Sequence, residues 1–230
     1  PDGQLADKTE FRKGQRHGSS QSFSEDGKLV RDETYRNGFP SGEARYYYDD
    51  GTLKREMNYQ NGKPVGEDKT YFEDGKLASV VVYGDARKTE KEYYSDGKLK
   101  LEKSFSVEQN KPAGTWKFYY PSGQLEKEES YVNGKLEGTI TTYYESGDVR
   151  STYQYRKGRK TATGKEYHPS GSLKTETEFY FGVPQGNFRE YHENGELSAE
   201  GAYNGGKKTG TWIFYNEKGA QINSQDFTRQ

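Results

Sequence analysis

The sequence repeats itself, and the repeat constrains the fold more than any other feature. The stretch "YVNGKLEGTITTYYESG" at residues 131–147 returns with few changes as "YQNGKPVGEDKTYFEDG" at 59–75. A turn glycine, usually followed two residues later by Leu, recurs every 24 residues, apart from one interval of 22 and one of 26. These turn glycines are Gly3, Gly27, Gly51, Gly75, Gly97, Gly123, Gly147, Gly171, Gly195 and Gly219. Such spacing predicts one repeat domain over residues 1–230, with about nine repeats and a half-repeat from Gly219.

Each repeat predicts a β-hairpin and a link to the next one. The segments between turns favour Tyr, Thr, Phe and Val, and glycine is too frequent for two helices. A three-residue loop, a type I turn closed by a left-handed glycine, would place the aromatic residue four before the glycine opposite the Leu two after it. Pro121 and Pro169 fit the second position of that turn. The fold class is therefore all-β: an elongated single-layer antiparallel meander.

Side-chain alternation predicts one continuous aromatic stripe. An aromatic residue stands eight positions after every turn glycine, and by the period of two it should share a face with the Tyr and Leu beside the turn. By the same parity, the acidic residues five after the glycine and the basic residues six before it should lie on opposite faces. We expect solvated charge there, with a docking track for an anionic partner as the alternative.

Composition excludes several kinds of partner. Only 29% of the residues are hydrophobic, but 21 Tyr and 11 Phe argue against disorder. The formal net charge of -1 gives no basic field for nucleic acid. No apolar run approaches the roughly 20 residues of a membrane span. There is no cysteine, and hence no thiolate chemistry or disulfide.

The sequence predicts no catalytic site, metal or cofactor. His168 and His192 occupy the same position in adjacent repeats, about 10 Å apart by the strand spacing, which is too far for a shared metal. We interpret them as replacements for the aromatic residues found there in other repeats, such as Tyr144 and Phe72. The glycines form no phosphate-binding loop, since "GKKTG" at 206–210 lacks the required spacing.

Two aromatic clusters are the candidate binding residues. "TWKFYY" and "TWIFY" place bulky rings where other repeats have Asp68, Glu90 or Thr70, on the face predicted to lie opposite the stripe. Exposed clusters of this kind are common in binding sites. The alternative is that the face is buried locally or that a Trp caps the last repeat. The candidates are Trp116, Phe118, Tyr120, Trp212 and Phe214.

The repeated wording "Y-x-N-G-K-x-x-G-x-x-x-x-Y-Y-x-x-G-x-L" resembles the MORN-repeat superfamily, and most closely its bacterial variant, often labelled YwqK-like antitoxin. The resemblance implies an elongated, twisted sheet that serves as a scaffold for contacts. It makes another protein the expected partner, with antitoxin-like binding as the family label. Glycan or membrane-surface contact is the alternative.

Two functions are therefore carried forward. The first is a non-catalytic bacterial interaction scaffold, and the second is a carbohydrate- or envelope-binding module that uses exposed aromatic side chains. The chain begins at Pro1 in the middle of a turn, which predicts that the native polypeptide continues upstream. A removed export signal would explain that start, so we expect an envelope or secreted location ahead of a cytoplasmic one.

Overall fold

The computed structural model describes residues 6–228, and these form twenty β-strands and no helix. They fall into two compact units, Pro1–Asn110 and Lys111–Gln230, which are described separately. Pro1 and Gly3, on which the sequence predicts the first turn, lie outside the described residues. The prediction of a single domain over residues 1–230 stays a prediction.

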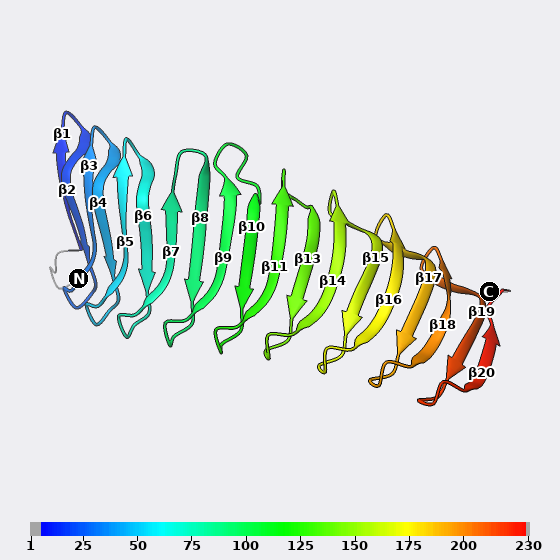
Figure 1. Ribbon diagram of the computed structural model, residues 1–230. Coiled ribbons are helices and arrows are strands. Elements are labelled where there is room, and N and C mark those ends of the chain that lie inside the picture. Colours follow the sequence, from blue (N-terminus) through cyan, green and yellow to red (C-terminus); the bar gives the residue numbers. More distant parts are fainter. Residues whose placement is uncertain (1–5, 229–230) are drawn as a thin grey trace. The chain divides into compact units, whose positions relative to one another are not determined.

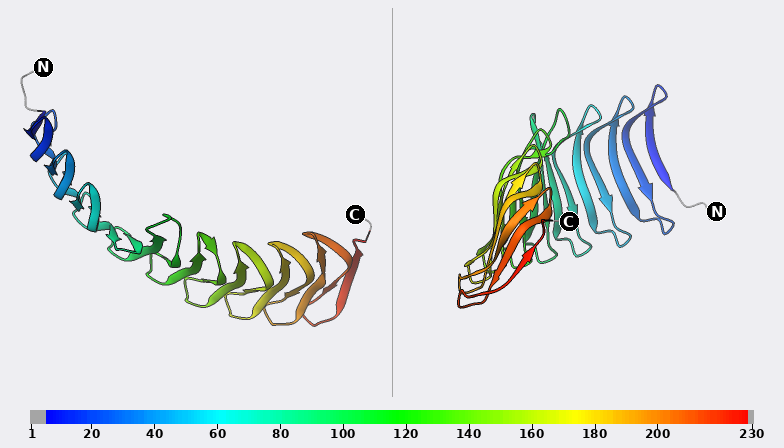
Figure 2. Two further views of the ribbon diagram at one scale, coloured as in Figure 1. Left: turned by 90° about the horizontal axis from the view of Figure 1, so that it is seen from above. Right: turned by 90° about the vertical axis from the view of Figure 1, so that its right-hand side faces the viewer.

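In each unit the strands follow one another in chain order as an antiparallel meander, and Figures 1 and 2 show no second layer over either sheet. The strands of the first unit are β1 (Asp7–Arg12), β2 (Gln15–Phe23), β3 (Leu29–Arg36), β4 (Phe39–Tyr47), β5 (Leu53–Gln60), β6 (Lys63–Tyr71), β7 (Leu77–Tyr83), β8 (Arg87–Tyr93) and β9 (Leu99–Ser106). Those of the second are β10 (Gly114–Tyr119), β11 (Leu125–Val132), β12 (Lys135–Leu136), β13 (Gly138–Tyr143), β14 (Val149–Arg156), β15 (Arg159–Tyr167), β16 (Leu173–Tyr180), β17 (Val183–Tyr191), β18 (Leu197–Asn204), β19 (Lys207–Tyr215) and β20 (Gln221–Asp226). The all-β hairpin meander is confirmed.

The predicted loop at the turn glycine is also confirmed. The Tyr48 amide donates to the Thr52 carbonyl, and the Gly51 amide donates back to the Tyr48 carbonyl, both at 2.9 Å. Gly51 has a φ of 91°, which a residue with a Cβ rarely adopts. Tyr47 then pairs directly with Leu53, as expected for a three-residue loop.

Most of the opposite strand ends are joined by two-residue turns, and the connections β7–β8 and β9–β10 are longer. At the turn between β5 and β6, Asn61 and Gly62 have φ values of 51° and 77°. Positive φ at both central residues is typical of a type I′ turn, whose twist matches that of the flanking strands. The "NGK" motif in the sequence encodes this turn.

The prediction of a single aromatic stripe is wrong, because the described hairpins that close at a turn glycine contain a β-bulge beside it. In β10 and β11 the register passes from Phe118 opposite Lys127 to Tyr119 opposite Leu125, which leaves Glu126 as an extra residue. One extra residue reverses the side to which all later side chains point. The ring of Tyr131 therefore lies on the opposite face from Tyr119 and Leu125.

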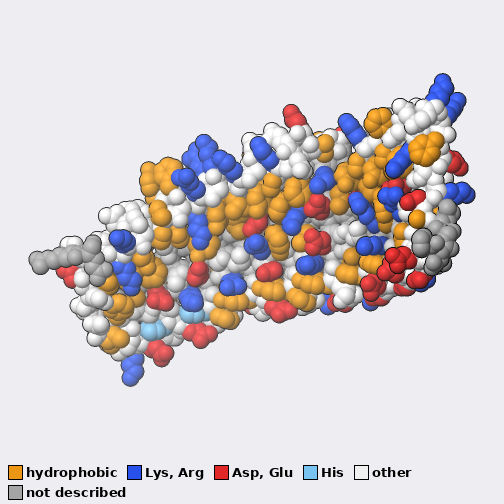
Figure 3. Space-filling view, turned by 180° about the vertical axis from the view of Figure 1, so that it is seen from behind, with side chains coloured by type: hydrophobic (Ala, Val, Ile, Leu, Met, Phe, Trp, Pro, Cys, Tyr) orange, Lys and Arg blue, Asp and Glu red, His pale blue; other side chains and the backbone are white. Residues whose placement is uncertain are grey.

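The bulges give the sheet two distinct faces, which we name after the side chains they carry. The ring face carries Trp116, Phe118, Lys127 and Tyr131 in β10–β11, together with the aligned residues of the other hairpins. The charge face carries Lys117, Tyr119, Leu125 and Glu128 with their equivalents. Figure 3 shows how hydrophobic side chains form bands among acidic and basic ones on the surface in view.

The ring face holds most of the buried core. Buried hydrophobic residues aligned with it are Ala44, Met57, Leu101, Ile140, Ala199 and Trp212, and Val80 is buried on the charge face. A glycine makes room for a large ring at two places. A Cβ on Gly164 would lie 2.3 Å from the Tyr153 ring, and one on Gly201 would lie 2.4 Å from the Trp212 ring. The core is therefore a single layer of rings laid against small residues of neighbouring strands.

Candidate binding surfaces

The prediction that Trp212 is exposed is wrong, because its side chain is only 2% exposed. Its ring stacks on Phe188 with centroids 5.1 Å apart, and Tyr203 meets it edge-on at 5.2 Å. The Lys208 ammonium lies 3.9 Å from the ring centroid, and the indole Nε1 donates to the Ala202 carbonyl at 3.2 Å. Trp212 is a core residue of the last hairpins, in agreement with the alternative that it caps the repeat array.

The other four candidates are partly buried. The Trp116 ring lies 4.6 Å from that of Tyr131, so both belong to the ring face, and the prediction that they lie on opposite faces is wrong. The bulge beside the turn glycine is the cause. The Lys127 ammonium lies 4.1 Å from the centroid of Phe118. Phe214 is half-buried beside Trp212. A binding role for Trp116, Phe118, Tyr120 and Phe214 stays a prediction.

In several repeats the side chain three residues before the turn glycine forms a hydrogen bond to the next repeat. The Tyr120 and Tyr144 hydroxyls donate to the carbonyls of Tyr143 and Tyr167, at 2.8 and 2.7 Å. Nε2 of His168 makes the same contact with the Tyr191 carbonyl at 3.0 Å. His192 repeats it with Tyr215 at 2.9 Å. Since a carbonyl can only accept, Nε2 is the protonated nitrogen, and both histidines replace Tyr, as predicted.

Tyr144→Phe should therefore lower the free energy of unfolding of the second unit by about 1 kcal/mol, the value of one part-buried hydrogen bond. Urea denaturation followed by circular dichroism measures the change. His168→Tyr keeps a donor at that position and serves as the control, with little change expected. An unaltered midpoint for Tyr144→Phe would show that the contact between repeats contributes nothing.

The predicted separation of acidic and basic residues is also wrong. Because of the bulge both sets lie on the charge face, where they pair across strands. Lys165 lies 3.0 Å from Glu176, and Lys91 lies 3.3 Å from Glu102. Exposed pairs of this kind contribute about 0–1 kcal/mol each. These ion pairs neutralise basic side chains of the charge face, which the sequence analysis considered as a docking track for an anionic partner.

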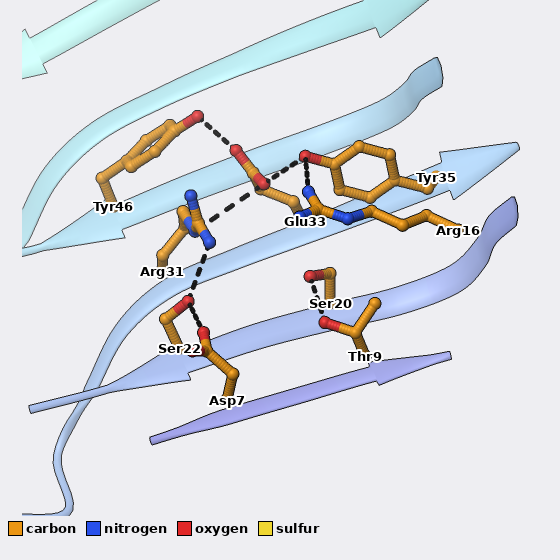
Figure 4. Close-up of polar contacts among 9 residues, drawn as sticks. All are labelled: Asp7, Thr9, Arg16, Ser20, Ser22, Arg31, Glu33, Tyr35 and Tyr46. Atoms are coloured by element: carbon orange, nitrogen blue, oxygen red, sulfur yellow. Dashed lines mark hydrogen bonds and ion pairs between the residues drawn. The ribbon is translucent and has the colours of Figure 1, made fainter. Parts of the chain in front are cut away.

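The first unit has a polar network on its ring face, drawn in Figure 4. The Glu33 carboxylate is buried and accepts hydrogen bonds from the Tyr46 and Tyr35 hydroxyls at 2.6 and 2.8 Å. The Arg31 guanidinium approaches it to 3.7 Å, and Arg16 donates to the Tyr35 hydroxyl at 3.2 Å. Since these contacts satisfy the carboxylate from inside the protein, Glu33 holds strands together and is not a free ligand-binding group.

Arg31 extends the hydrogen-bond network to β1, at the edge of the sheet. It donates to the Ser22 hydroxyl at 2.9 Å, and Ser22 donates to Asp7 at 2.6 Å. Two hairpins further on, Asp68 is only 5% exposed and receives two hydrogen bonds from Arg55, at 2.8 and 2.7 Å. Buried charge on this face is thus matched locally, as the low dielectric requires.

These tyrosines should make the fold sensitive to alkali. Burial and then the hydrogen bond to Glu33 raise the pKa of Tyr46, and the same causes raise the pKa of Tyr35. Burial, with the hydrogen bond to Glu56, raises the pKa of Tyr71 to about 12. A pKa raised in the folded state stabilises it below the unfolded value, about 10, and that contribution is lost as pH rises towards the folded value.

We therefore expect the free energy of unfolding to be level up to about pH 10 and to fall between about pH 10 and 12. Urea denaturation across that range, with tyrosinate absorbance recorded in parallel, measures both changes. In Tyr46→Phe the fall should be shallower. A wild-type protein whose stability is constant through the tyrosine titration would contradict the prediction.

The turns of the second unit form a groove that the sequence reading missed. Its volume is about 620 Å³, and four cations from two turns border it: Lys135, Arg156, Lys157 and Arg159. Phe179, Tyr180 and Phe181 supply aromatic surface, and Thr161 and Ala162 complete it. We call this site the turn groove. Tyr180 and Phe181 are 64% and 60% exposed, and as neighbours they form an exposed aromatic pair.

Phe181 is in an unfavourable backbone conformation. It occupies the turn position at which Asn37, Asn61 and Asn133 stand in other repeats, and its φ is 49°. Asn tolerates the left-handed region, whereas for a bulky residue it is an outlier. The sequence signal was present in "YFGV" at 180–183, where an aromatic pair replaces the usual Asn-containing turn.

Phe181→Asn should stabilise the second unit by about 1 kcal/mol, the lower limit for such a strained residue. A urea denaturation series measures the gain, and Asn133→Phe is the reverse control that should lose a similar amount. A lower midpoint for Phe181→Asn would mean that the exposed ring contributes more to folding than its conformation costs.

Neither a metal centre nor a membrane helix is found in the described chain. Among residues 6–228, no three His, Asp or Glu side chains gather closely enough to hold a metal ion. Over the same residues no helix has the length and apolar character needed to cross a bilayer.

The strands, turns and surfaces define a class of protein, a β-hairpin repeat scaffold. A family model described as MORN repeat variant matches seven segments that cover more than half of the chain. They are residues 16–37, 40–61, 88–106, 113–133, 136–157, 160–180 and 184–204. The chain belongs to the MORN repeat variant family, whose members are generally non-catalytic binding scaffolds.

Other comparisons add little. A search of curated proteins finds no match. Among solved structures, "Crystal Structure of TcdB2-TccC3-Cdc42" matches with 14% identity and a TM-score of 0.22, over 99% of this chain and 13% of that one. "Crystal Structure of TcdB2-TccC3" matches with 12% identity and a TM-score of 0.19, over 96% of this chain and 15% of that one. Both TM-scores are too low to support an argument.

Proposed function

We propose that this chain is a non-catalytic scaffold that binds another protein. The observation that carries the proposal is the exposed aromatic turn of a single-layer sheet, with Tyr180 and Phe181 presented to solvent beside the turn groove. A surface ring that is not needed to fill the core is available for a partner, and Tyr and Phe are enriched in protein interfaces.

The finer form of the proposal is a bacterial, antitoxin-like role, in which the scaffold neutralises a partner by covering it. Co-expression with the products of neighbouring genes tests it, with complex formation measured by size-exclusion chromatography and calorimetry. We expect a stoichiometric complex and, if the neighbour inhibits growth, restored growth on co-expression. Neighbouring products that remain separate from this chain would count against the antitoxin-like role.

Carbohydrate or envelope binding is the second candidate, and it rests on Trp116, which is only partly buried on the ring face. Retention on a glycan array that is lost in Trp116→Ala with an unchanged fold would favour it. Trp212→Ala cannot serve here, because Trp212 belongs to the core. Turnover of a substrate that disappears on changing His168 or His192 would overturn the non-catalytic assignment.

A further inference from the structure

The turn groove combines aromatic surface with unpaired positive charge. Among residues 6–228, none of its four cations makes an ion pair, whereas many Lys and Arg side chains on the strands are paired. The Glu137 carboxylate accepts a hydrogen bond from the Lys157 backbone amide at 2.9 Å, and not from the Lys157 ammonium. No acidic side chain lines the groove. Its charge is therefore left for a ligand to neutralise.

The aromatic surface is held in place before any ligand arrives. The rings of Tyr180 and Phe181 meet edge-on with centroids 4.5 Å apart. The Arg159 guanidinium lies 5.9 Å from the centroid of Phe181, and the short turn between β16 and β17 fixes the backbone. Rings ordered in advance lose little conformational entropy on binding. The turn requires a positive φ at this position but does not require a phenylalanine, since Asn or Gly would fit better.

We propose that the turn groove binds a short acidic segment of a partner protein. A hydrophobic side chain of that segment packs against Phe179 and Phe181, while its carboxylates pair with Arg156, Lys157 and Arg159. The inference rests on the proposed function and names the chemistry of the partner. Arginine is well suited to this task, because its planar fork matches a carboxylate and also stacks on aromatic rings.

Charge and shape favour a peptide over other ligands. A neutral glycan would use the rings but leave the four cations without partners. A membrane surface needs an open plane of cations and inserted rings, whereas these groups converge on a concave site of about 620 Å³. A space of that size holds a few side chains of an extended segment.

A selection of short random peptides displayed on phage, with the intact chain as bait, tests the inference. We expect enrichment of Asp and Glu next to aromatic or aliphatic residues. Fluorescence anisotropy should then show that the selected peptides lose at least about tenfold in affinity in Phe181→Asn and in Arg156→Gln with Arg159→Gln. Binding to the wild type should also weaken as salt is raised, because the carboxylate contacts are screened.

Phe39→Lys is the matched control. Phe39 is 61% exposed on another turn, against 60% for Phe181, and Lys63 and Lys135 occupy the same turn position in other repeats. This variant should bind the peptides as the wild type does. Phe181→Asn should unfold at an equal or higher urea concentration, so that a loss of affinity cannot be ascribed to misfolding.

Four results would overturn the inference. Peptides without acidic enrichment, or with the same affinity for Phe181→Asn, would place binding elsewhere on the chain and leave the proposed scaffold function standing. Binding to vesicles of phosphatidylcholine with phosphatidylglycerol that the same variants abolish, without peptide binding, would make the groove a lipid contact. A failure to select any peptide would reject the acidic segment, while co-expression with neighbouring gene products tests the scaffold function separately.

Discussion

Trp212→Ala is expected to lower the free energy of unfolding of the second unit by about 3–5 kcal/mol, the range for removing a fully buried large ring. The Trp212 ring covers Gly201, stacks on Phe188 and lies beneath the Lys208 ammonium. A single-layer sheet has no second layer of side chains to fill the space it would leave. The loss should therefore fall near the upper end of that range.

Hydrogen exchange is the measurement of choice, because repeat arrays do not always unfold as one cooperative unit. Amides of β17–β20 should lose protection, while those of β1–β9 keep theirs. Trp116→Ala is the control: the Trp116 ring is partly exposed, so its removal should cost much less. Equal effects of the two substitutions would show that burial of Trp212 is not what stabilises the last hairpins.

The repeat made most of the fold predictable. The spacing of the turn glycines, together with Pro121 and Pro169, was enough to predict the three-residue loop and the pairing of Tyr and Leu beside it. It was not enough to predict the bulge, because the extra residue, Glu126 in β11, looks like any other strand residue. Because of this extra residue, the aromatic and acidic side chains that follow it lie on the opposite face from the one predicted.

The candidate site was less predictable for a different reason. Trp116 and Trp212 stand at equivalent positions, yet their burial differs. Gly201 on the preceding strand leaves space for the Trp212 ring, whereas the Trp116 ring lies against Tyr131 and stays partly exposed. Burial in a single-layer sheet depends on the residue across the strand, which the pattern of one strand does not contain. The sequence shows Phe181 at a position where other turns have Asn, but only the structure shows that its side chain is exposed.

Gly164→Ala is the second large expected effect, a loss of about 1–3 kcal/mol from overpacking. The added methyl group would lie 2.3 Å from Cδ1 of Tyr153 and 3.1 Å from Cε2 of Phe179, so these two rings, which meet edge-on, would have to move. Lys160 would move with them, since its ammonium lies 3.4 Å from the Tyr153 ring centroid. In the absence of the ring, alanine should instead stabilise a strand relative to glycine.

The sign of the effect therefore identifies its cause. In a Tyr153→Ala background, Gly164→Ala should be neutral or stabilising, and a double-mutant cycle measured by urea denaturation gives the coupling between the two sites. Gly171→Ala is the control, because Gly171 has a φ of 85° and open space around its Cα, so its cost comes from the backbone and should persist in both backgrounds. If Gly164→Ala is as costly without the Tyr153 ring as with it, the small residue is required by the backbone, and the packing of rings against glycines is not what holds this sheet together.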